Sequence, residues 1–210
     1  MRNLILIGGG GHAHSVIDVI ESSHDFRIMG IADRKGKMGA RVLNYIITAT
    51  DDKLDALVND NQYFLITVGQ IETAEIRLRL DQELKHAGAK LAQVVSPLAK
   101  VSKYATVAEG TVVMHFALVN AGAQVGRNAI VNTQAAVEHD VIVGDFCHIS
   151  TGAILNGGVK VGNQVFIGSH ATVRQGISIA DNVVIGAHSY VHQDISEAGV
   201  YAGVPAQRIR

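Results

Sequence analysis

The chain has 210 residues, of which 48% are hydrophobic, and its formal net charge is −1. This near-neutral charge argues against nucleic-acid binding through bulk electrostatics, and no apolar run is long enough to span a bilayer. The apolar start is too short for a secretory signal, and a single cysteine excludes an internal disulfide framework. We therefore expect a cytoplasmic protein with one large domain or two small ones.

Strand and helix patterns alternate over the first part of the chain. Apolar runs predict strands over 3–7, 26–32, 63–68 and 90–95, and helices are predicted over 12–21, 51–60 and 73–86. In the last of these helices Ile76, Leu80 and Leu84 are spaced along one face. Such alternation is typical of a parallel sheet covered by helices. The sequence therefore predicts a small α/β, Rossmann-like domain over residues 1–96.

A glycine-rich loop joins the first predicted strand to the first predicted helix. Residues Gly8 to Ala13 fit the pattern G-x-G-x-x-A, in which glycines let the backbone approach a phosphate and the helix start offers N–H groups to it. Asp33 follows the second strand, where a ribose-binding acid would lie. Because the domain is too short for a full dinucleotide fold, a nucleotide-sugar is a better candidate ligand than NAD. The alternative is a tight turn that binds nothing.

From Val101 to Ile195 the chain repeats every six residues. All sixteen first positions are Val, Ile or Leu, the fifth is nearly always small or β-branched, and glycine recurs at the second and fourth. A short fixed period indicates a solenoid. Three units can close a triangular coil, with first and fifth side chains inward and successive coils about 4.8 Å apart. The sequence predicts a parallel β-helix over residues 97–198, with glycine at left-handed or crowded corners.

The tail, residues 199–210, leaves the six-residue register. We expect it to cap the last coil and to cover a strand edge that would otherwise be open.

Candidate catalytic residues lie in the repeat around His139. This histidine is flanked by Glu138 and Asp140, and a neighbouring carboxylate can raise the basicity of an imidazole. The residues alone do not decide which of the two acids is its partner. One coil later, on the same edge, Gly157 exposes backbone whose N–H can lie beside a reacting carbonyl. The pattern indicates a general base next to a hydrogen-bond donor.

Other polar residues of the repeat are weaker candidates. Asn132 and His148 lie on either side of the His139 motif. Cys147 occupies an inward fifth position, so it is expected to be a core residue and not a nucleophile. His170 and His188 occupy fourth positions one coil apart. We expect these two to stack on one outer ridge as a solvated or interface pair.

Three runs of sequence together resemble the bacterial nucleotide-sugar acetyltransferase family: GGGGH, EHDVIVGDFCHISTGAILNGGVKVG and AGVPAQRIR. The resemblance covers almost the entire chain and implies that the β-helix is left-handed. It implies an acetyl-CoA-dependent N-acetyltransferase acting on the amino group of a UDP-4-amino-4,6-dideoxy sugar. Relatives that O-acetylate sialic acid supply the alternative activity. The resemblance also implies a homotrimer with active sites between subunits.

The same resemblance implies roles for individual residues. His139 matches the general base, and Asp140 matches the acid that orients it, where relatives carry Glu. In a trimer His170 and His188 are expected near a neighbour's His139 site or the coenzyme. The residues matching the acetyl-CoA site are His148 at the thioester, Gly157 at the acetyl oxygen, and Ser169 and Ala187 along the pantetheine. Those assigned to the substrate are Gly10, Gly11, His12, Asp33 and Asn132.

Two alternative functions are a zinc enzyme and a non-catalytic scaffold. A zinc enzyme of the carbonic-anhydrase type would need two histidines two coils apart, and no pair here is 36 residues apart. We therefore expect no metal site. The other is a non-catalytic scaffold that uses the coil as an assembly surface, and such a protein would not bind coenzyme A.

Overall fold

The computed structural model describes all residues, 1–210, and divides into two compact units. The first comprises Met1–Gly69 and Glu75–Val94, and the second comprises Gln70–Ala74 and Val95–Arg210. The short segment Gln70–Ala74 lies within the α/β part of the sequence, yet it groups with the second unit because its backbone contacts the β-helix. Neither of the two α-helices combines the length and the hydrophobicity needed to cross a membrane.

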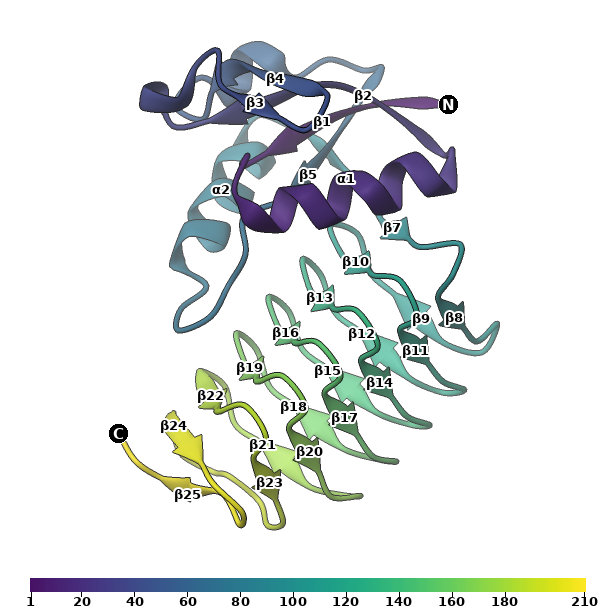
Figure 1. Ribbon diagram of the computed structural model, residues 1–210, viewed down its shortest axis with the longest axis vertical. Coiled ribbons are helices and arrows are strands. Elements are labelled where there is room, and N and C mark those ends of the chain that lie inside the picture. Colours follow the sequence, from purple (N-terminus) through teal and green to yellow (C-terminus); the bar gives the residue numbers. More distant parts are fainter. The chain divides into compact units, whose positions relative to one another are not determined.

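The first unit is built on one six-stranded sheet of order β3-β4-β2-β1-β5-β6, of which Figure 1 labels β1 to β5. Strand β1 lies in the interior of the sheet and pairs in parallel with β2 and with β5. Its apolar residues Leu4 to Ile7 are buried, as expected for a strand covered on both faces. The elements are β1 (Arg2–Ile7), α1 (Gly11–Ser23), β2 (Phe26–Asp33), a 3₁₀ turn (Lys35–Lys37), β3 (Arg41–Val42), β4 (Tyr45–Thr50), a second 3₁₀ turn (Leu54–Leu57), β5 (Gln62–Ile66), α2 (Glu75–His86) and β6 (Lys90–Leu91).

Four details of this unit differ from the sequence prediction. The helix predicted over 51–60 is only the 3₁₀ turn Leu54–Leu57. Strand β4 was not predicted, because Ile47 is its one buried residue and its apolar pattern is weak. The strand predicted over 90–95 divides into β6, which pairs with β5, and β7 (Val94–Val95), which joins the β-helix. On α2 Ile76 is 57% exposed, and Arg77 is buried beside Leu80 and Leu84.

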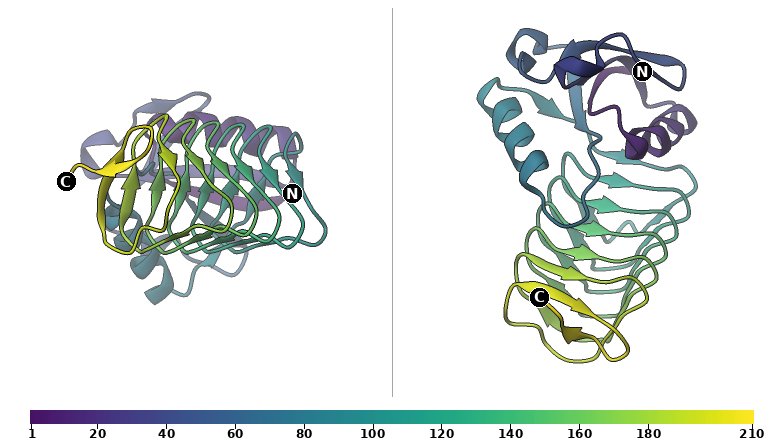
Figure 2. Two further views of the ribbon diagram at one scale, coloured as in Figure 1. Left: turned by 90° about the horizontal axis from the view of Figure 1, so that it is seen from below. Right: turned by 60° about the vertical axis from the view of Figure 1, so that its left-hand side comes forward.

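The second unit is a three-sided parallel β-helix, as the six-residue repeat predicts. Figure 2 shows its coils stacked one above the next. Strands eighteen residues apart pair in parallel, for example Val112 with Ile130 and Gln124 with Ile142. They form three sheets: an eight-stranded sheet that includes β13, β16, β19 and β22, a six-stranded sheet that includes β14, β17 and β20, and a five-stranded sheet that includes β12, β15 and β18.

Most strands of the β-helix contain only two residues, one each from the sixth and first repeat positions. They are β8 (Lys100–Val101), β9 (Thr106–Val107), β10 (Val112–Val113), β11 (Leu118–Val119), β12 (Gln124–Val125), β13 (Ile130–Val131), β14 (Ala136–Val137), β15 (Ile142–Val143), β16 (His148–Ile149), β17 (Ile154–Leu155), β18 (Lys160–Val161), β19 (Phe166–Ile167), β20 (Thr172–Val173), β21 (Ser178–Ile179), β22 (Val183–Ile185) and β23 (Tyr190–Val191).

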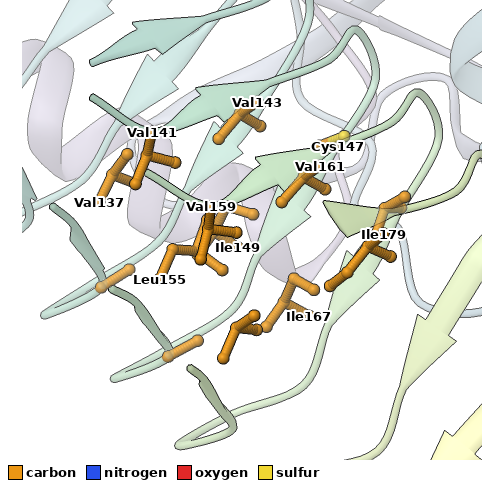
Figure 3. Close-up of a cluster of buried hydrophobic side chains, with 14 of the residues drawn as sticks. Val137, Val141, Val143, Cys147, Ile149, Leu155, Val159, Val161, Ile167 and Ile179 are labelled. Carbon is orange, nitrogen blue, oxygen red and sulfur yellow. The ribbon is translucent and has the colours of Figure 1, made fainter. Parts of the chain in front are cut away.

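The core of the β-helix is formed by the first and fifth repeat positions, which are buried along nearly its whole length. Figure 3 shows Val137, Val141, Val143, Cys147 and Ile149 directed into the interior. Each fully buried aliphatic side chain of this size contributes about 1.5–3 kcal/mol to the free energy of unfolding. The inward orientation predicted for these two positions is confirmed.

The corners explain why glycine recurs at two positions of the repeat. Every fourth position from Gly110 to His188 has a positive φ, which glycine adopts without strain. At the second position the backbones of adjacent coils approach closely, and a Cβ on Gly144 would lie 2.6 Å from the carbonyl oxygen of Gly162. The two glycine positions therefore meet different requirements, a left-handed backbone and a crowded one.

The tail extends the eight-stranded sheet. Strand β24 (Gly199–Ala202) pairs in parallel with β22, and β25 (Gln207–Arg208) pairs antiparallel with β24. The edge of β22 is thus covered, which is the capping role expected for residues beyond the repeat.

Candidate active site

The central feature of the site is a hydrogen-bonded pair of exposed side chains. His139 and Asp140 follow β14 at the corner between the six-stranded and five-stranded sheets, called here the His139 corner. Nδ1 of His139 lies 3.0 Å from Oδ2 of Asp140, and the two side chains are 64% and 73% exposed. Because a carboxylate only accepts hydrogen bonds, Nδ1 carries the proton and Nε2 is the basic nitrogen. The pair presents an oriented base to solvent.

Glu138, the other acid beside His139, is engaged elsewhere. Its Oε2 accepts a hydrogen bond of 2.7 Å from Nδ2 of Asn120, one coil earlier. Asn120 is itself fixed, because its Oδ1 accepts the N–H of Ala121 at 2.8 Å. Asp140 is therefore the acid that orients the imidazole in this structure. The role of Asn120 was not predicted, although its spacing of eighteen residues from Glu138 was a usable signal.

Two glycines of adjacent coils make room for the pair. A Cβ on Gly157 would lie 2.5 Å from Cε1 of His139, and a Cβ on Gly122 would meet Oδ1 of Asp140. The amide N–H of Gly157 donates no hydrogen bond within the chain, whereas that of Gly158 donates to the carbonyl of His139 at 2.9 Å. An unpaired donor thus lies next to the basic imidazole. Gly122 is a further residue that the sequence did not single out.

His148 occupies a buried position and is only 7% exposed. Its Nδ1 lies 2.7 Å from the carbonyl oxygen of Gln70, so this nitrogen is the donor. Its Nε2 then accepts from Nδ2 of Asn132 at 3.0 Å. Since both nitrogens are occupied in this arrangement, we interpret His148 as the residue that holds Asn132 and the Gln70–Ala74 segment. Its predicted contact with a coenzyme stays a prediction.

Ser169 and Ala187 lie one coil apart at a second corner, between the eight-stranded and six-stranded sheets, called here the Ser169 corner. Neither amide N–H donates a hydrogen bond within the chain. Oγ of Ser169 is 3.0 Å from Oγ of Ser150. Asn132 lies at this corner too, two coils and one residue before Ser169. The predicted site residues are therefore divided between two corners of one β-helix.

The first unit contains a cavity of about 480 Å³ that is lined by the predicted residues Gly10, Gly11, His12 and Asp33. Helix α1 begins at Gly11, and Gly10 is its N-cap. A Cβ on either glycine would meet no atom within 4 Å, so the backbone here is open. A helix start of this kind offers N–H groups and a partial positive charge to an anion.

Asp33 is held by three hydrogen bonds. It accepts from the N–H of Gly9 at 2.7 Å, from Nζ of Lys37 at 3.0 Å and from the N–H of Arg34 at 2.7 Å. Burial acts to raise the pKa of Asp33, but these hydrogen bonds together outweigh it and the pKa lies below its ordinary value. The carboxylate is thus a stable anion that fixes the glycine loop against β2.

The cavity has cationic residues that the sequence did not predict. Arg34, Lys37 and Arg79 all line it, together with Asp51. Arg79 donates to Asp51 at 3.3 Å across a separation of 28 residues. Only the fold brings these side chains together, because they come from the loop after β2, from the loop after β4 and from α2. The balance of charge favours an anionic ligand.

The buried Arg77 supports one wall of this cavity. Its Nη1 donates to the carbonyl of Val68 at 2.6 Å, and Val68 and Gly69 line the cavity. Burial lowers the pKa of Arg77 to about 10, against the opposing effect of Asp81, so it stays cationic at neutral pH. The sequence predicts that Ile76 belongs to the apolar face of α2, but in the structure Ile76 is exposed and Arg77 is buried.

Cys147 is expected to be unreactive in the folded protein. Burial raises the pKa of its thiol to about 12, and Sγ donates to the carbonyl of Gly162 at 3.0 Å. A thiol-specific disulfide reagent at pH 8 should therefore label the native chain very slowly and the denatured chain at once, because the thiolate is the reacting form. Rapid labelling of the native chain would contradict this assignment.

No group of three or more His, Cys, Asp and Glu side chains is arranged to hold a metal ion. His170 and His188 stack on each other, with ring centroids 5.3 Å apart.

Comparison with known proteins adds independent observations. The family model of the PglD N-terminal domain matches residues 3–80, and that of the bacterial transferase hexapeptide (six repeats) matches residues 158–193. A curated relative, UDP-N-acetylbacillosamine N-acetyltransferase of Bacillus subtilis, is 33% identical over 114 residues, which are 53% of this chain. The match spans about half, 51%, of that relative's length.

Solved structures match over the whole chain. The acetyltransferase domain of PglB from Neisseria gonorrhoeae is 30% identical with a TM-score of 0.92, and the match covers 100% of both chains. PerB from Caulobacter crescentus, in complex with CoA and GDP-perosamine, is 30% identical with a TM-score of 0.92, covering 100% of this chain and 98% of PerB. Variants of the Caulobacter perosamine N-acetyltransferase with one histidine replaced by asparagine or alanine were also solved with CoA and GDP-perosamine.

Proposed function

The chain belongs to the nucleotide-sugar N-acetyltransferase family, and we propose that it transfers the acetyl group of acetyl-CoA to the amino group of a nucleotide-linked amino sugar. The substrate class we propose is a UDP-4-amino-4,6-dideoxy sugar, in line with the curated bacillosamine relative. The observation that carries the proposal is the exposed pair of His139 and Asp140 beside the unpaired N–H of Gly157.

His139 is the proposed general base. An amine attacks a thioester only through its lone pair, and the bond that forms leaves a proton on nitrogen for removal. Nε2 of His139 accepts that proton, and Asp140 stabilises the imidazolium through Nδ1. A base positioned in this way contributes about 10²–10⁴-fold to the rate.

Gly157 is the proposed donor to the developing oxyanion. When the amine adds to the thioester carbonyl, the oxygen becomes negative, and a preset N–H stabilises it by about 3–4 kcal/mol. The N–H of Gly157 has no acceptor within the chain that would compete for it. Collapse of the tetrahedral intermediate expels coenzyme A as a thiolate. No covalent enzyme intermediate is needed, which agrees with a buried Cys147.

The cavity of the first unit is the proposed site of the nucleotide portion. The N-terminus of α1 at Gly10 and Gly11 suits a diphosphate, and Lys37 and Arg79 add positive charge at the same cavity. His12 lines the cavity beside them. We assign Asp33 to fixing the glycine loop and to meeting the ribose or base.

A second copy of the chain is proposed to complete the acyl-transfer site. His139 and Gly157 lie at one corner of the β-helix, whereas Asn132, Ser169 and Ala187 lie at another. A cleft between two neighbouring β-helices can unite the two kinds of corner, and a closed ring of three copies is the proposed assembly. We also propose a cytoplasmic location, where acetyl-CoA is available.

The activity is tested by measuring release of the coenzyme A thiol. Acetyl-CoA is supplied with a panel of UDP-, GDP- and CMP-linked amino sugars and with a free sialic acid, and the acetylated product is identified by mass spectrometry. We expect turnover with a UDP-linked amino sugar and an amide product. Turnover of sialic acid alone, with an ester product, would contradict N-acetylation of a nucleotide sugar.

Replacing Asp33 by alanine is expected to raise the KM for the nucleotide sugar about tenfold or more, because the carboxylate fixes the glycine loop and a loop that is no longer fixed must be ordered again on binding. The KM for acetyl-CoA should not change, because the Gly9 loop and Lys37 belong to the first unit, whereas the proposed acyl-transfer site lies in the β-helix. Steady-state kinetics with each substrate varied in turn gives both values. Asp25→Ala, an exposed change in the same unit, is the control. An equal rise in both KM values would point to a general loss of structure.

A further inference from the structure

The hairpin of β3 and β4, at the edge of the sheet in the first unit (Figure 1), has one packed side and one open side. Val42 and Ile47 are buried and point toward the glycine loop, since a Cβ on Gly9 would lie 2.9 Å from the side chain of Val42 and 3.0 Å from that of Ile47. Arg41 and Ile46 pair across the hairpin, so their side chains are neighbours on the opposite face. Arg41 is exposed there, and Ile46 is 46% exposed.

Two further apolar side chains are exposed at this hairpin. Met38 is 50% exposed and lines a cavity of about 440 Å³ together with Thr48, which is two residues after Ile46 and therefore on the same face. Leu43 is 50% exposed and begins the two-residue loop of the hairpin at φ 52°, where asparagine or glycine fits with less strain. The turn itself therefore gives no reason for a leucine. Met38, Leu43 and Ile46 are called here the hairpin patch.

Positive charge is concentrated around the hairpin patch. Residues 34–53 contain five of the 18 Lys and Arg residues of the chain but only two of its 19 Asp and Glu residues. Lys35 and Lys53 line the same cavity as the patch, and Arg41 lies within the hairpin. These three side chains are exposed and form no salt bridge within the chain. Asp52, which also lines the cavity, offsets part of their charge. The surface thus combines exposed apolar side chains with an excess of positive charge.

The charge of this surface distinguishes between its possible occupants. A second copy of the chain would bring the same cations to the contact, and like charges repel. A soluble acidic polypeptide matches the cations but gives no reason for an exposed leucine at the hairpin tip. A bilayer with anionic headgroups matches both features, because Met, Leu and Ile side chains enter the boundary between headgroups and acyl chains. Each Lys or Arg near such a surface strengthens binding about fivefold.

We propose that the hairpin patch, together with Lys35, Arg41 and Lys53, binds the surface of an anionic phospholipid bilayer. The inference goes beyond the proposed function and does not depend on it, since none of these residues belongs to the sites assigned above. A few cations and a few apolar side chains give weak, reversible binding. Salt at about 0.5 M should therefore release the protein, because it screens the attraction between exposed charges and the headgroups.

Co-sedimentation with vesicles tests this surface, with phosphatidylglycerol mixed into phosphatidylcholine in one set and phosphatidylcholine alone in the other. Leu43→Asn removes the apolar tip and suits the positive φ of the turn, so the thermal unfolding temperature should stay the same or rise slightly. Its matched control is Leu98→Asn, at a leucine of the β-helix that is 54% exposed. A triple variant reverses the charge of the surface with Lys35→Glu, Arg41→Glu and Lys53→Glu. Its control is Lys160→Glu, an exposed change in the β-helix.

Wild-type protein is expected to bind the vesicles that contain phosphatidylglycerol and not those of phosphatidylcholine alone. Leu43→Asn should weaken this binding about threefold or more and the triple variant about a hundredfold or more, while both controls bind as the wild type does. No binding by the wild type, or equal binding by the wild type and these variants, would overturn the inference. Binding to soluble polyglutamate as strong as that to the vesicles would assign the surface to an acidic protein instead. Self-association of the wild type that Leu43→Asn abolishes would assign it to a second copy.

Discussion

His139→Ala is expected to lower kcat for acetyl transfer by about 10²–10⁴-fold, the contribution of a positioned general base. The KM for acetyl-CoA should change little, since the ring is proposed to act on the attacking amine. The fold should tolerate the change, because the side chain is 64% exposed and its hydrogen bond to Asp140 joins two exposed groups. Initial rates of thiol release, measured together with the unfolding temperature, check both statements.

Two companion variants sharpen this experiment. Asp140→Asn keeps the shape of the acid and removes its charge, so a loss smaller than that of His139→Ala is expected if Asp140 orients and strengthens the base. His14→Ala, an exposed change on α1, should leave turnover unaffected. Full activity in His139→Ala would show that the amine loses its proton to another group.

Mixing two inactive variants is expected to restore activity if two copies of the chain form each site. His139→Ala lacks the base, and Ala187→Trp blocks the row of donors at the Ser169 corner. Ala187 is exposed, so the larger side chain should not disturb the core. In assemblies of both variants, some interfaces combine the intact His139 corner of one copy with the intact Ser169 corner of the other.

Random mixing of equal amounts places about a quarter of the interfaces in this intact combination when contacts run head to tail around a ring. The variants are co-expressed with different affinity tags, mixed assemblies are isolated through both tags, and thiol release is measured. Each variant assembled alone is the baseline. Mixed assemblies no more active than the two baselines would indicate that each site lies within one chain.

The β-helix was predictable because the six-residue repeat shows directly which residues are buried. The first and fifth positions, such as Val137 and Val141, point inward. Because Val, Ile or Leu recurs at every sixth residue, no other alignment of the repeat would bury these side chains. The fourth position was equally readable, since glycine there marks a positive φ. The pair of His139 and Asp140 stood out for the same reason, because a histidine between two acids is unusual at such a corner.

The parts that could not be predicted depend on contacts between distant residues. Burial of Arg77 is determined by the carbonyl of Val68 at the end of another element, and no local pattern encodes that. The hydrogen bond between His148 and Gln70 joins residues 78 positions apart. The choice of Asp140 over Glu138 as partner depends on Asn120, which occupies Glu138 from the coil before.

All coils of the β-helix have the same height, so equivalent residues on successive coils are evenly spaced along its axis. Each added coil of eighteen residues repeats the inward pattern unchanged, so the number of coils can vary without a new core being invented. Such a change alters the distance, measured along the axis of the β-helix, between residues on either side of the added coil. Backbone groups that repeat along one corner are therefore spaced in steps of about 4.8 Å, and this spacing is set by the backbone and not by any side chain.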